Sequence, residues 1–238
     1  MHRREFTQAC LLAGVWGAWG ARAGGLAGLA LALPAWAQLG ESDAALGVRA
    51  ALERGATAAV GLLGRTDGFL GNQLVRIRLP SALEKAARLL KATGQGQRVD
   101  ELVTVMNRAA EASMAEARPL LVNAIKAMSV EEALKIVRGG ETSVTVFFSA
   151  KTRQPLGEKF LPVVTRATAK VGLAERYNAV AGQAAGWGLV KGEDANIQQY
   201  VTRRALDGLY TMIGVEEKKI RADPVGTGSA ILKKVFSR

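Results

Sequence analysis

Residues 99–114 read VDELVTVMNRAAEASM, with apolar side chains recurring every three or four positions, at Val99, Leu102, Val103, Met106, Ala110 and Met114. Because an α-helix turns once every 3.6 residues, this spacing places them all on one helical face. Most of the other positions in the stretch are charged, polar or small. The stretch therefore predicts an amphipathic helix that buries one face in a core.

The same spacing extends along most of the chain in both directions. Towards the N-terminus, Ser42 is expected to cap a helix that runs to about Leu63, with inward positions at Leu46, Ala50, Ala56 and Val60. Ser81 begins a second helix, which Gly94-Gln95-Gly96 closes. Towards the C-terminus we expect the longest helix, ended by Asp223-Pro224, with apolar residues at Ile197, Val201, Ala205, Leu209 and Ile213.

Between these helices the signals for helix starts and ends are less regular. Pro119 is expected to begin a new helix, because proline is tolerated in a first turn, and Pro155 another that runs to about Val171. Residues 129–132 (SVEE) form a capping box that starts a short helix ending at Gly139-Gly140. Residues 143–148 (SVTVFF) resemble a strand in isolation. A lone strand would have no partner, so we predict a helix there.

The first 37 residues are predicted to be a cleavable export signal. A twin arginine, Arg3-Arg4, precedes a weakly apolar stretch, and Ala35-Trp36-Ala37 offers small residues at the two positions that a signal peptidase recognises. We expect the twin-arginine route and a periplasmic mature protein; the general secretory route is the alternative. An uncleaved membrane anchor is disfavoured, because Arg22 interrupts the apolar stretch.

Removal of residues 1–37 takes away Cys10 and His2, the only cysteine and the only histidine. Catalytic arrangements that need either side chain are then excluded, as are zinc sites with nitrogen and sulfur ligands and iron–sulfur clusters held by cysteines. We therefore expect no metal site and no cofactor. Residues 38–238 should form one domain stabilised by its core and not by disulfides.

The formal net charge is +11, but lysines and arginines are scattered among acidic residues. A nucleic-acid-binding protein would show a dense basic stripe or a known motif, so we expect no nucleic-acid partner. Envelope proteins, anionic lipid and polyanionic polymers are the partners that an exported basic protein would meet. The basic and apolar segment 231–236 is too short to hold a membrane surface alone.

A series of short stretches resembles the signatures of one known family, in the same order: TDGFLGN (66–72) with VRI (75–77), MNRAAE (106–111), KFLP (159–162), YVT (200–202), ALDGL (205–209), EEKKIR (216–221) and LKKVF (232–236). They are similar to the bacterial domain-of-unknown-function family numbered 4197, over about residues 39–236. The resemblance implies an all-helical exported domain of Gram-negative bacteria and supports a helix over 142–153. It implies no activity, so no catalytic residue is assigned.

One departure from the family's pattern concerns the ambiguous stretch. Where members tend to have Ala-Ala-Thr and a Tyr-Phe pair, this chain has Ser143-Val144-Thr145 and Phe147-Phe148. The difference puts in doubt any role for a tyrosine hydroxyl at that position.

The connection over residues 65–80 is the expected binding site, because it is about twice as long as a usual link between helices. Its arginines can bind a carboxylate or a phosphate in bidentate fashion. The candidate binding residues, which include two on the polar side of the third helix, are Asp67, Asn72, Arg76, Asn107, Arg108 and Asp207. In the alternative, structural interpretation Asp67-Gly68 forms a tight turn, Phe69 and Leu70 fill the core, and Arg76 caps helix carbonyls.

The sequence thus predicts an all-α protein with a single compact multi-helix domain after a cleavable signal. We expect an envelope-associated binding or structural domain. The alternative is an enzyme that uses carboxylate and arginine side chains without histidine or cysteine.

The predicted cleavage site can be tested on the native protein. If a signal peptidase cuts after Ala37, the mature chain begins at Gln38. Intact mass measurement of the protein from its own host should show the chain without residues 1–37. A mass that still includes those residues would contradict the cleavage.

Overall fold

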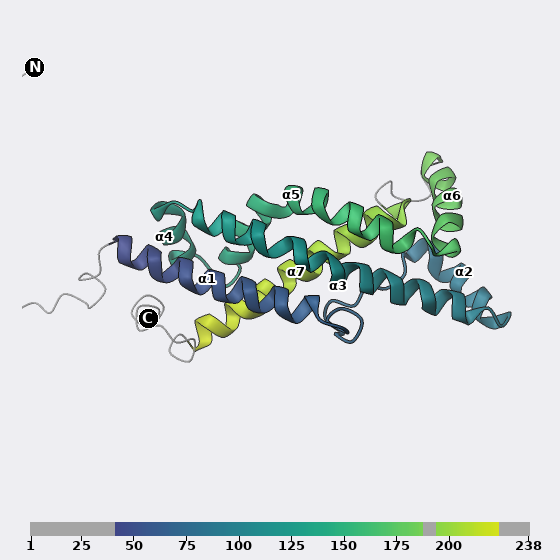
Figure 1. The fold of residues 1–238 in the computed structure, drawn as a ribbon, viewed down its shortest axis with the longest axis horizontal. Coiled ribbons are helices and arrows are strands. Elements are labelled where there is room, and N and C mark those ends of the chain that lie inside the picture. Colours follow the sequence, from purple (N-terminus) through teal and green to yellow (C-terminus); the bar gives the residue numbers. More distant parts are fainter. Residues whose placement is uncertain (1–40, 188–193, 224–238) are drawn as a thin grey trace, which may run out of the picture. The chain divides into compact units, whose positions relative to one another are not determined.

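The computed structural model describes residues 41–187 and 194–223, which all belong to one compact unit, residues 33–238. These described residues form seven helices and no strand, so the all-α prediction is confirmed (Figure 1): α1 (Glu41–Gly64), α2 (Ser81–Ala92), α3 (Gly96–Lys126), α4 (Val130–Arg138), α5 (Ser143–Thr168), α6 (Gly172–Gly186) and α7 (Ile197–Ala222). The predicted signal and the segment 231–236 lie outside the described residues.

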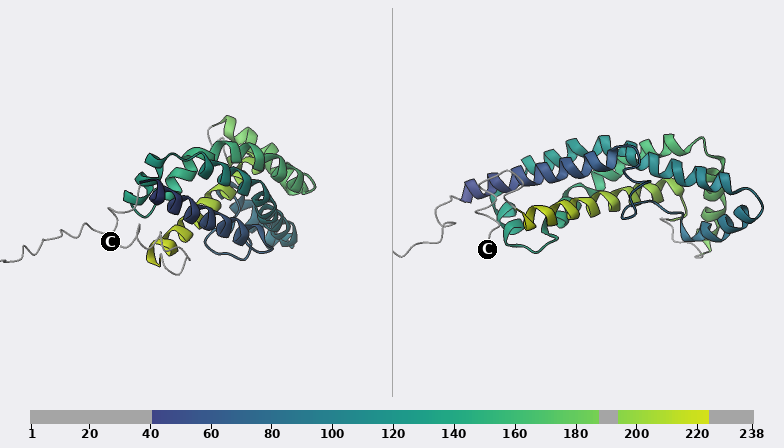
Figure 2. Two further views of the ribbon diagram at one scale, coloured as in Figure 1. Left: turned by 60° about the vertical axis from the view of Figure 1, so that its left-hand side comes forward. Right: turned by 90° about the horizontal axis from the view of Figure 1, so that it is seen from below.

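Four long helices, α1, α3, α5 and α7, form the core of this unit. Helix α3 packs against each of the other three and also contacts α2 and α6 (Figure 2). Helix α4 covers α1 and α5 at one end, and α6 also contacts α7. Because α3 has the most partners, its side chains decide how the neighbouring segments are held.

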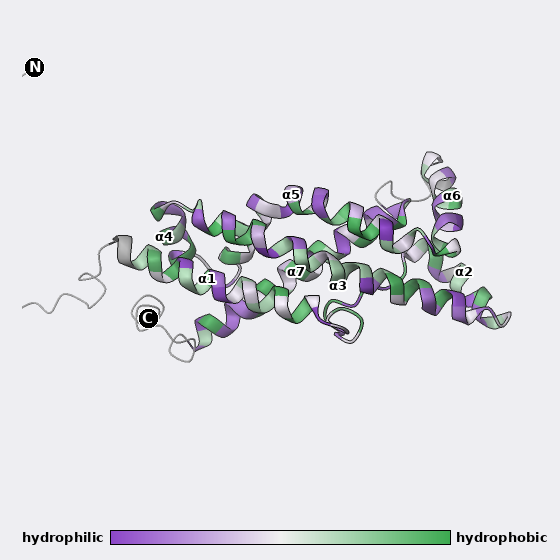
Figure 3. Cartoon of the chain, in the orientation of Figure 1, coloured by the Kyte–Doolittle hydropathy of each residue, from purple (hydrophilic) through white to green (hydrophobic). Residues whose placement is uncertain are grey.

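The predicted apolar stripes of α3 and α7 form the core. All five α7 positions are buried, and of the six in α3 only Val103 is half-buried. In α1, Ala56 and Val60 are buried, but Leu46 and Ala50 are exposed, so those two predictions are wrong. The small apolar residues of α1 lie on most sides of the helix, so its sequence defines no single apolar stripe. Figure 3 shows how hydrophobic and hydrophilic residues alternate along the long helices.

Three prolines lie inside helices, which corrects two predicted helix starts. Pro119 lies within α3, and Pro155 and Pro162 lie within α5. Pro119 and Pro162 are exposed and Pro155 is half-buried, so water can hydrate the carbonyl that each proline leaves without a partner. As a result α3, with 31 residues, is longer than α7, with 26, and the prediction that α7 is the longest helix is also wrong.

Two of the less certain starts are helical as predicted. The capping box is present, with the Glu132 N–H donating to Ser129 Oγ over 3.1 Å and the Ser129 N–H donating to Glu132 over 2.9 Å. Residues 143–148 form the first turns of α5, so the helix prediction is confirmed there. Helix α6 has no counterpart among the predicted helices.

Pro119 offers a test of the continuous α3. Replacing Pro119 with alanine restores a backbone hydrogen bond to the Ala115 carbonyl at an exposed position, which should raise the free energy of unfolding by about 2 kcal/mol. Urea denaturation measures the change. Pro80→Ala, at a position that precedes a helix, should bring no such gain. Equal effects of the two substitutions would contradict a continuous helix through residue 119.

Candidate functional site

The connection between α1 and α2, residues 65–80, folds back onto the core in two close approaches. Gly68 is needed because a Cβ there would lie 2.4 Å from the Leu63 carbonyl oxygen. Gly208 on α7 is needed because a Cβ there would lie 2.6 Å from the Phe69 ring, which is fully buried. The predicted turn at Asp67-Gly68 is present, and its Gly68 N–H donates to the Arg65 carbonyl over 2.9 Å.

Polar side chains of α3 hold this connection in place. The Asn107 amide accepts from the Ile77 N–H and donates to the Ile77 carbonyl, each over 2.9 Å. Glu111 accepts from the N–H groups of Phe69 and Leu70, over 3.1 and 3.2 Å. Asn107 and Glu111 are both buried, so they supply hydrogen bonds to backbone groups that water would not reach.

Arg108 completes this arrangement at the surface. Its guanidinium donates to Glu111 over 2.7 Å and to Asp67 over 2.8 Å. The hydrogen bonds to Glu111 and then to Asp67 raise the pKa of Arg108 above its ordinary value. Asp67 itself has a φ of 64°, a left-handed conformation that aspartate tolerates better than most residues.

The second half of the connection alternates between inward and outward side chains. Val75 and Ile77 are buried, whereas Leu74, Arg76 and Arg78 are exposed. The Tyr200 hydroxyl of α7 donates to the Arg78 carbonyl over 2.9 Å, so this segment is held from both sides. The alternation therefore presents two arginines to solvent on a fixed backbone.

Three grooves adjoin this segment. One of about 390 Å³ lies against α7 and is lined by Arg76, Arg78, Arg204 and Asp207 among others. A second, of about 490 Å³, also contains Arg78 and Arg204, with Glu84, Asp194 and Arg203. The third, of about 380 Å³, lies against α2 and α3 and is lined by Arg76, Arg78, Glu84, Arg88, Lys91 and Asp100 among others.

Ion pairs neutralise some of the charges in these linings. Asp207 accepts from Arg153 over 3.0 Å, Asp100 pairs with Lys91 over 3.0 Å, and Asp194 pairs with Arg203. Within residues 41–187 and 194–223, four arginines of the linings have no carboxylate partner: Arg76, Arg78, Arg88 and Arg204. We call these four residues the arginine strip. Glu84 is the one lining carboxylate without an ion pair in the same ranges.

Arg204 is oriented by an aromatic neighbour. Its guanidinium carbon lies 5.6 Å from the centroid of the Tyr200 ring, and its Nε donates to the Tyr200 hydroxyl over 3.4 Å. The Arg203 guanidinium carbon lies 5.7 Å from the same centroid. Both distances are within the range of a cation–π contact, which orients the guanidinium without neutralising its positive charge.

The six candidate residues do not converge on one pocket. Arg76 and Asp207 line the groove against α7, but Asp207 is held by Arg153. Asp67, Asn107 and Arg108 hold the connection, and Asn107 is buried, not on a polar face as expected. Asn72 accepts from the Leu74 N–H over 3.1 Å, a local turn contact.

Arg78 is one of the arginines of the connection that the sequence indicated as anion ligands, although it is not among the six candidate residues. Two residues of the arginine strip, Arg88 and Arg204, were not predicted. Neither had a distinguishing signal, since each is one of many charged residues on a helix surface. The structural alternative proves right for Phe69, but the expected capping of helix carbonyls by Arg76 is absent among its described contacts.

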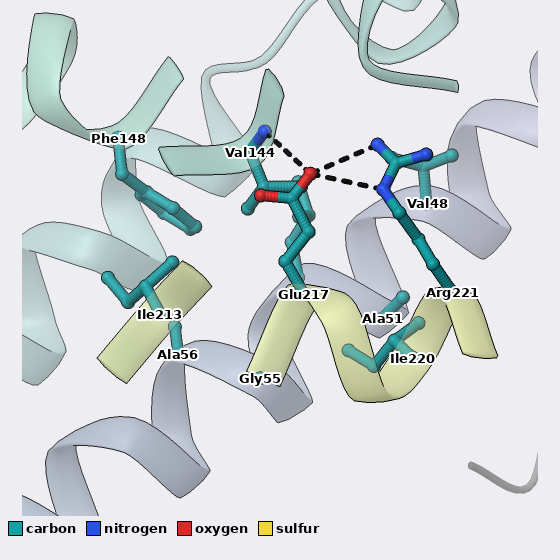
Figure 4. Close-up of a pocket in the computed structure, with 11 residues that line it drawn as sticks. Val48, Ala51, Gly55, Ala56, Val144, Phe148, Ile213, Glu217, Ile220 and Arg221 are labelled. Carbon is teal, nitrogen blue, oxygen red and sulfur yellow. Dashed lines mark hydrogen bonds and ion pairs between the residues drawn. The ribbon is translucent and has the colours of Figure 1, made fainter. Parts of the chain in front are cut away.

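A second buried acidic group lies at the other end of the core, on α7 (Figure 4). Glu217, which is 3% exposed, accepts from the Val144 N–H over 3.2 Å and from Arg221 over 3.0 Å. Glu217 and Arg221 lie one helical turn apart, a spacing that favours the ion pair observed between them. The adjoining apolar cavity, of about 20 Å³, has room for roughly one water molecule, so this group is structural and holds the start of α5.

The comparisons with known proteins place the chain in a family. The matching family model is described as a protein of unknown function (DUF4197), and it covers residues 38–237. The chain belongs to this family. Comparison with curated proteins and with solved structures gave no match. Both stretches that carried the resemblance lie at this site. TDGFLGN forms the turn that α3 and Gly208 hold, and MNRAAE contains the three residues that hold it, Asn107, Arg108 and Glu111.

Two further observations concern membranes and metals in this DUF4197 chain. None of the helices described here combines the length and the apolar content that crossing a membrane requires. Among the described residues, no three histidine, cysteine, aspartate or glutamate side chains gather where they would hold a metal ion.

Asn107 can be tested as the residue that fixes the connection. Asn107→Leu keeps the volume but leaves the buried N–H and carbonyl of Ile77 without partners, which should cost about 2–4 kcal/mol of unfolding free energy. Urea denaturation measures the loss. Asn123→Leu, at an exposed position of the same helix, is the matched control and should change stability little. Similar losses from both substitutions would contradict the role given to Asn107.

Proposed function

We propose that this DUF4197 protein is an exported, envelope-associated helical domain that binds an anionic group through Arg76, Arg78 and Arg204. The observation that carries the proposal is the groove of about 390 Å³ in which these three arginines meet without a carboxylate partner among the described residues. Like charges brought together on a rigid backbone repel one another, and a bound anion removes that repulsion.

The choice of arginine indicates the kind of anion. A guanidinium presents planar pairs of N–H donors, which match the paired oxygens of a phosphate or a carboxylate. Phosphate offers more oxygens in more directions, so several arginines can bind it at once. A phosphate-bearing ligand is therefore the best match for three arginines that line one groove.

The only carboxylate in the described lining of this groove is engaged elsewhere. Asp207 lies 3.0 Å from the Arg153 guanidinium, and Arg153 also lies over the Tyr210 ring, 5.0 Å from its centroid. The Asp207 carboxylate is therefore already occupied by a guanidinium donor. This arrangement favours binding over the alternative, an enzyme that uses a carboxylate as general base.

Export is the second part of the proposal, and it rests on the sequence. The region that matches the family model begins at residue 38, which is the first residue after the predicted cleavage site. A targeting segment varies independently of the domain that it exports, so a family boundary at that point supports cleavage there. An envelope location would bring the protein close to lipids and polymers that carry phosphate.

Arg78 is the residue with which to test anion binding, because it lines all three grooves. We expect Arg78→Gln to weaken the binding of inorganic pyrophosphate roughly ten-fold, the effect of losing one charge-assisted hydrogen bond. Titration calorimetry on the purified protein measures the affinity.

Arg65→Gln provides the matched control for this experiment. Arg65 lies in the same connection and is also exposed, but it is in none of the three groove linings. The control removes the same charge and should leave pyrophosphate binding nearly unchanged. If wild type binds no pyrophosphate, or if both variants bind as wild type does, the proposed site is wrong.

A further inference from the structure

The three grooves are connected through shared arginines. Arg78 lines all three, Arg76 lines two and Arg204 lines two. The grooves therefore adjoin one another around the segment that α3 and Tyr200 hold in place. Positive charge without an ion-pair partner extends from α2 across this segment to α7.

The two ends of the arginine strip lie in different grooves. Arg88 on α2 lines only the groove against α2 and α3, whereas Arg204 lines only the other two. A single phosphate bound beside Arg204 is therefore in a different groove from Arg88. A chain of linked anionic groups can occupy adjoining grooves and meet both.

The openness of the grooves also favours a chain. Pockets for small molecules are concave and mostly apolar, and they enclose most of the ligand surface. Here the arginines Arg76, Arg78, Arg88 and Arg204 are all exposed. A ligand at such a surface gains affinity from many weak contacts along its length and needs no enclosure.

The linings argue against two other polyanionic surfaces. Tyr200 is the only aromatic residue in the described linings, and it is 4% exposed, so nucleobases would have no ring on which to stack. Leu74, 70% exposed, is the only large apolar side chain there that extends into solvent. One leucine gives little insertion into a lipid surface.

We propose that the arginine strip binds a linear polyanion of repeated phosphate groups, in a continuous path from Arg204 past Arg78 to Arg88. This inference rests on the proposed function, because Arg76, Arg78 and Arg204 form one end of the path. It adds a second contact region around Arg88, which a small anion does not need. Each arginine that meets a phosphate releases counterions, so the affinity falls with rising salt.

The test compares anions of increasing length on the purified protein. Orthophosphate, tripolyphosphate and a linear polyphosphate of roughly a dozen groups are titrated by calorimetry at several salt concentrations. We expect affinity per molecule to rise by at least ten-fold from tripolyphosphate to the long chain, because the linked groups bind cooperatively. Equal affinity for all three lengths would overturn the inference and leave the smaller anion site intact.

Substitutions at the far end of the path separate this inference from the proposed function. Arg88→Gln should lower the affinity for the long polyphosphate about five-fold, reduce the salt dependence of that binding and leave pyrophosphate binding unchanged. Glu84→Gln removes a negative charge from two groove linings and should raise the affinity for the long polyphosphate. Arg65→Gln is again the control, and it should have no effect on either anion.

Four outcomes contradict the continuous path. Two concern the variants: Arg88→Gln binds the long chain as tightly as wild type does, or Glu84→Gln binds it more weakly than wild type does. Tighter binding to an oligodeoxythymidylate with the same number of phosphates would assign the surface to nucleic acid. Tighter binding to phosphatidylglycerol vesicles at equal accessible phosphate would assign it to membranes. Thermal unfolding of each variant should match wild type, because Arg88 and Glu84 are exposed.

Discussion

The hydrogen bonds between side chains of α3 and the connection between α1 and α2 are the interaction on which the rest of the site depends. A segment without regular structure that packs on a core must find partners for its buried N–H and carbonyl groups. Asn107 and Glu111 supply those partners from a helix that is itself fixed by five neighbours. Because Val75 and Ile77 are buried in the core, the alternating positions Arg76 and Arg78 face solvent.

A buried glutamate that accepts from backbone N–H groups also occurs at the other end of the core. Glu217 on α7 accepts from the N–H groups of Val144 and Thr145, at the start of α5, where Thr142 supplies no cap. Each buried glutamate also has an arginine one turn away on its own helix, Arg108 for Glu111 and Arg221 for Glu217. A buried carboxylate is costly unless it is paired and hydrogen-bonded, and both conditions are met here.

Local patterns predicted most of the helices, and failures occurred where tertiary contacts decide. The α3 and α7 stripes are strictly periodic, so their buried faces were predictable. Pro119 was misleading, because whether a proline ends a helix depends on which side faces solvent. The start of α5 depends on Glu217, 73 residues away from Val144. The site depends on Arg78 and Arg204 lining the same groove, which no local sequence pattern indicates.

The arginine strip differs from the rest of the described surface in how its charges are paired. Elsewhere, many charged side chains are paired along one helix, as in Glu131 with Lys135 and Glu216 with Lys219. Such pairs are typical of a solvated surface and contribute little. Arg76 and Arg78 have no such partner among the described residues, although they lie on an irregular segment that α3 and Tyr200 hold by hydrogen bonds. A fixed backbone beneath unpaired arginines lowers the entropy that the protein loses when an anion binds. Arginines that were only solvated would not need a backbone held in this way.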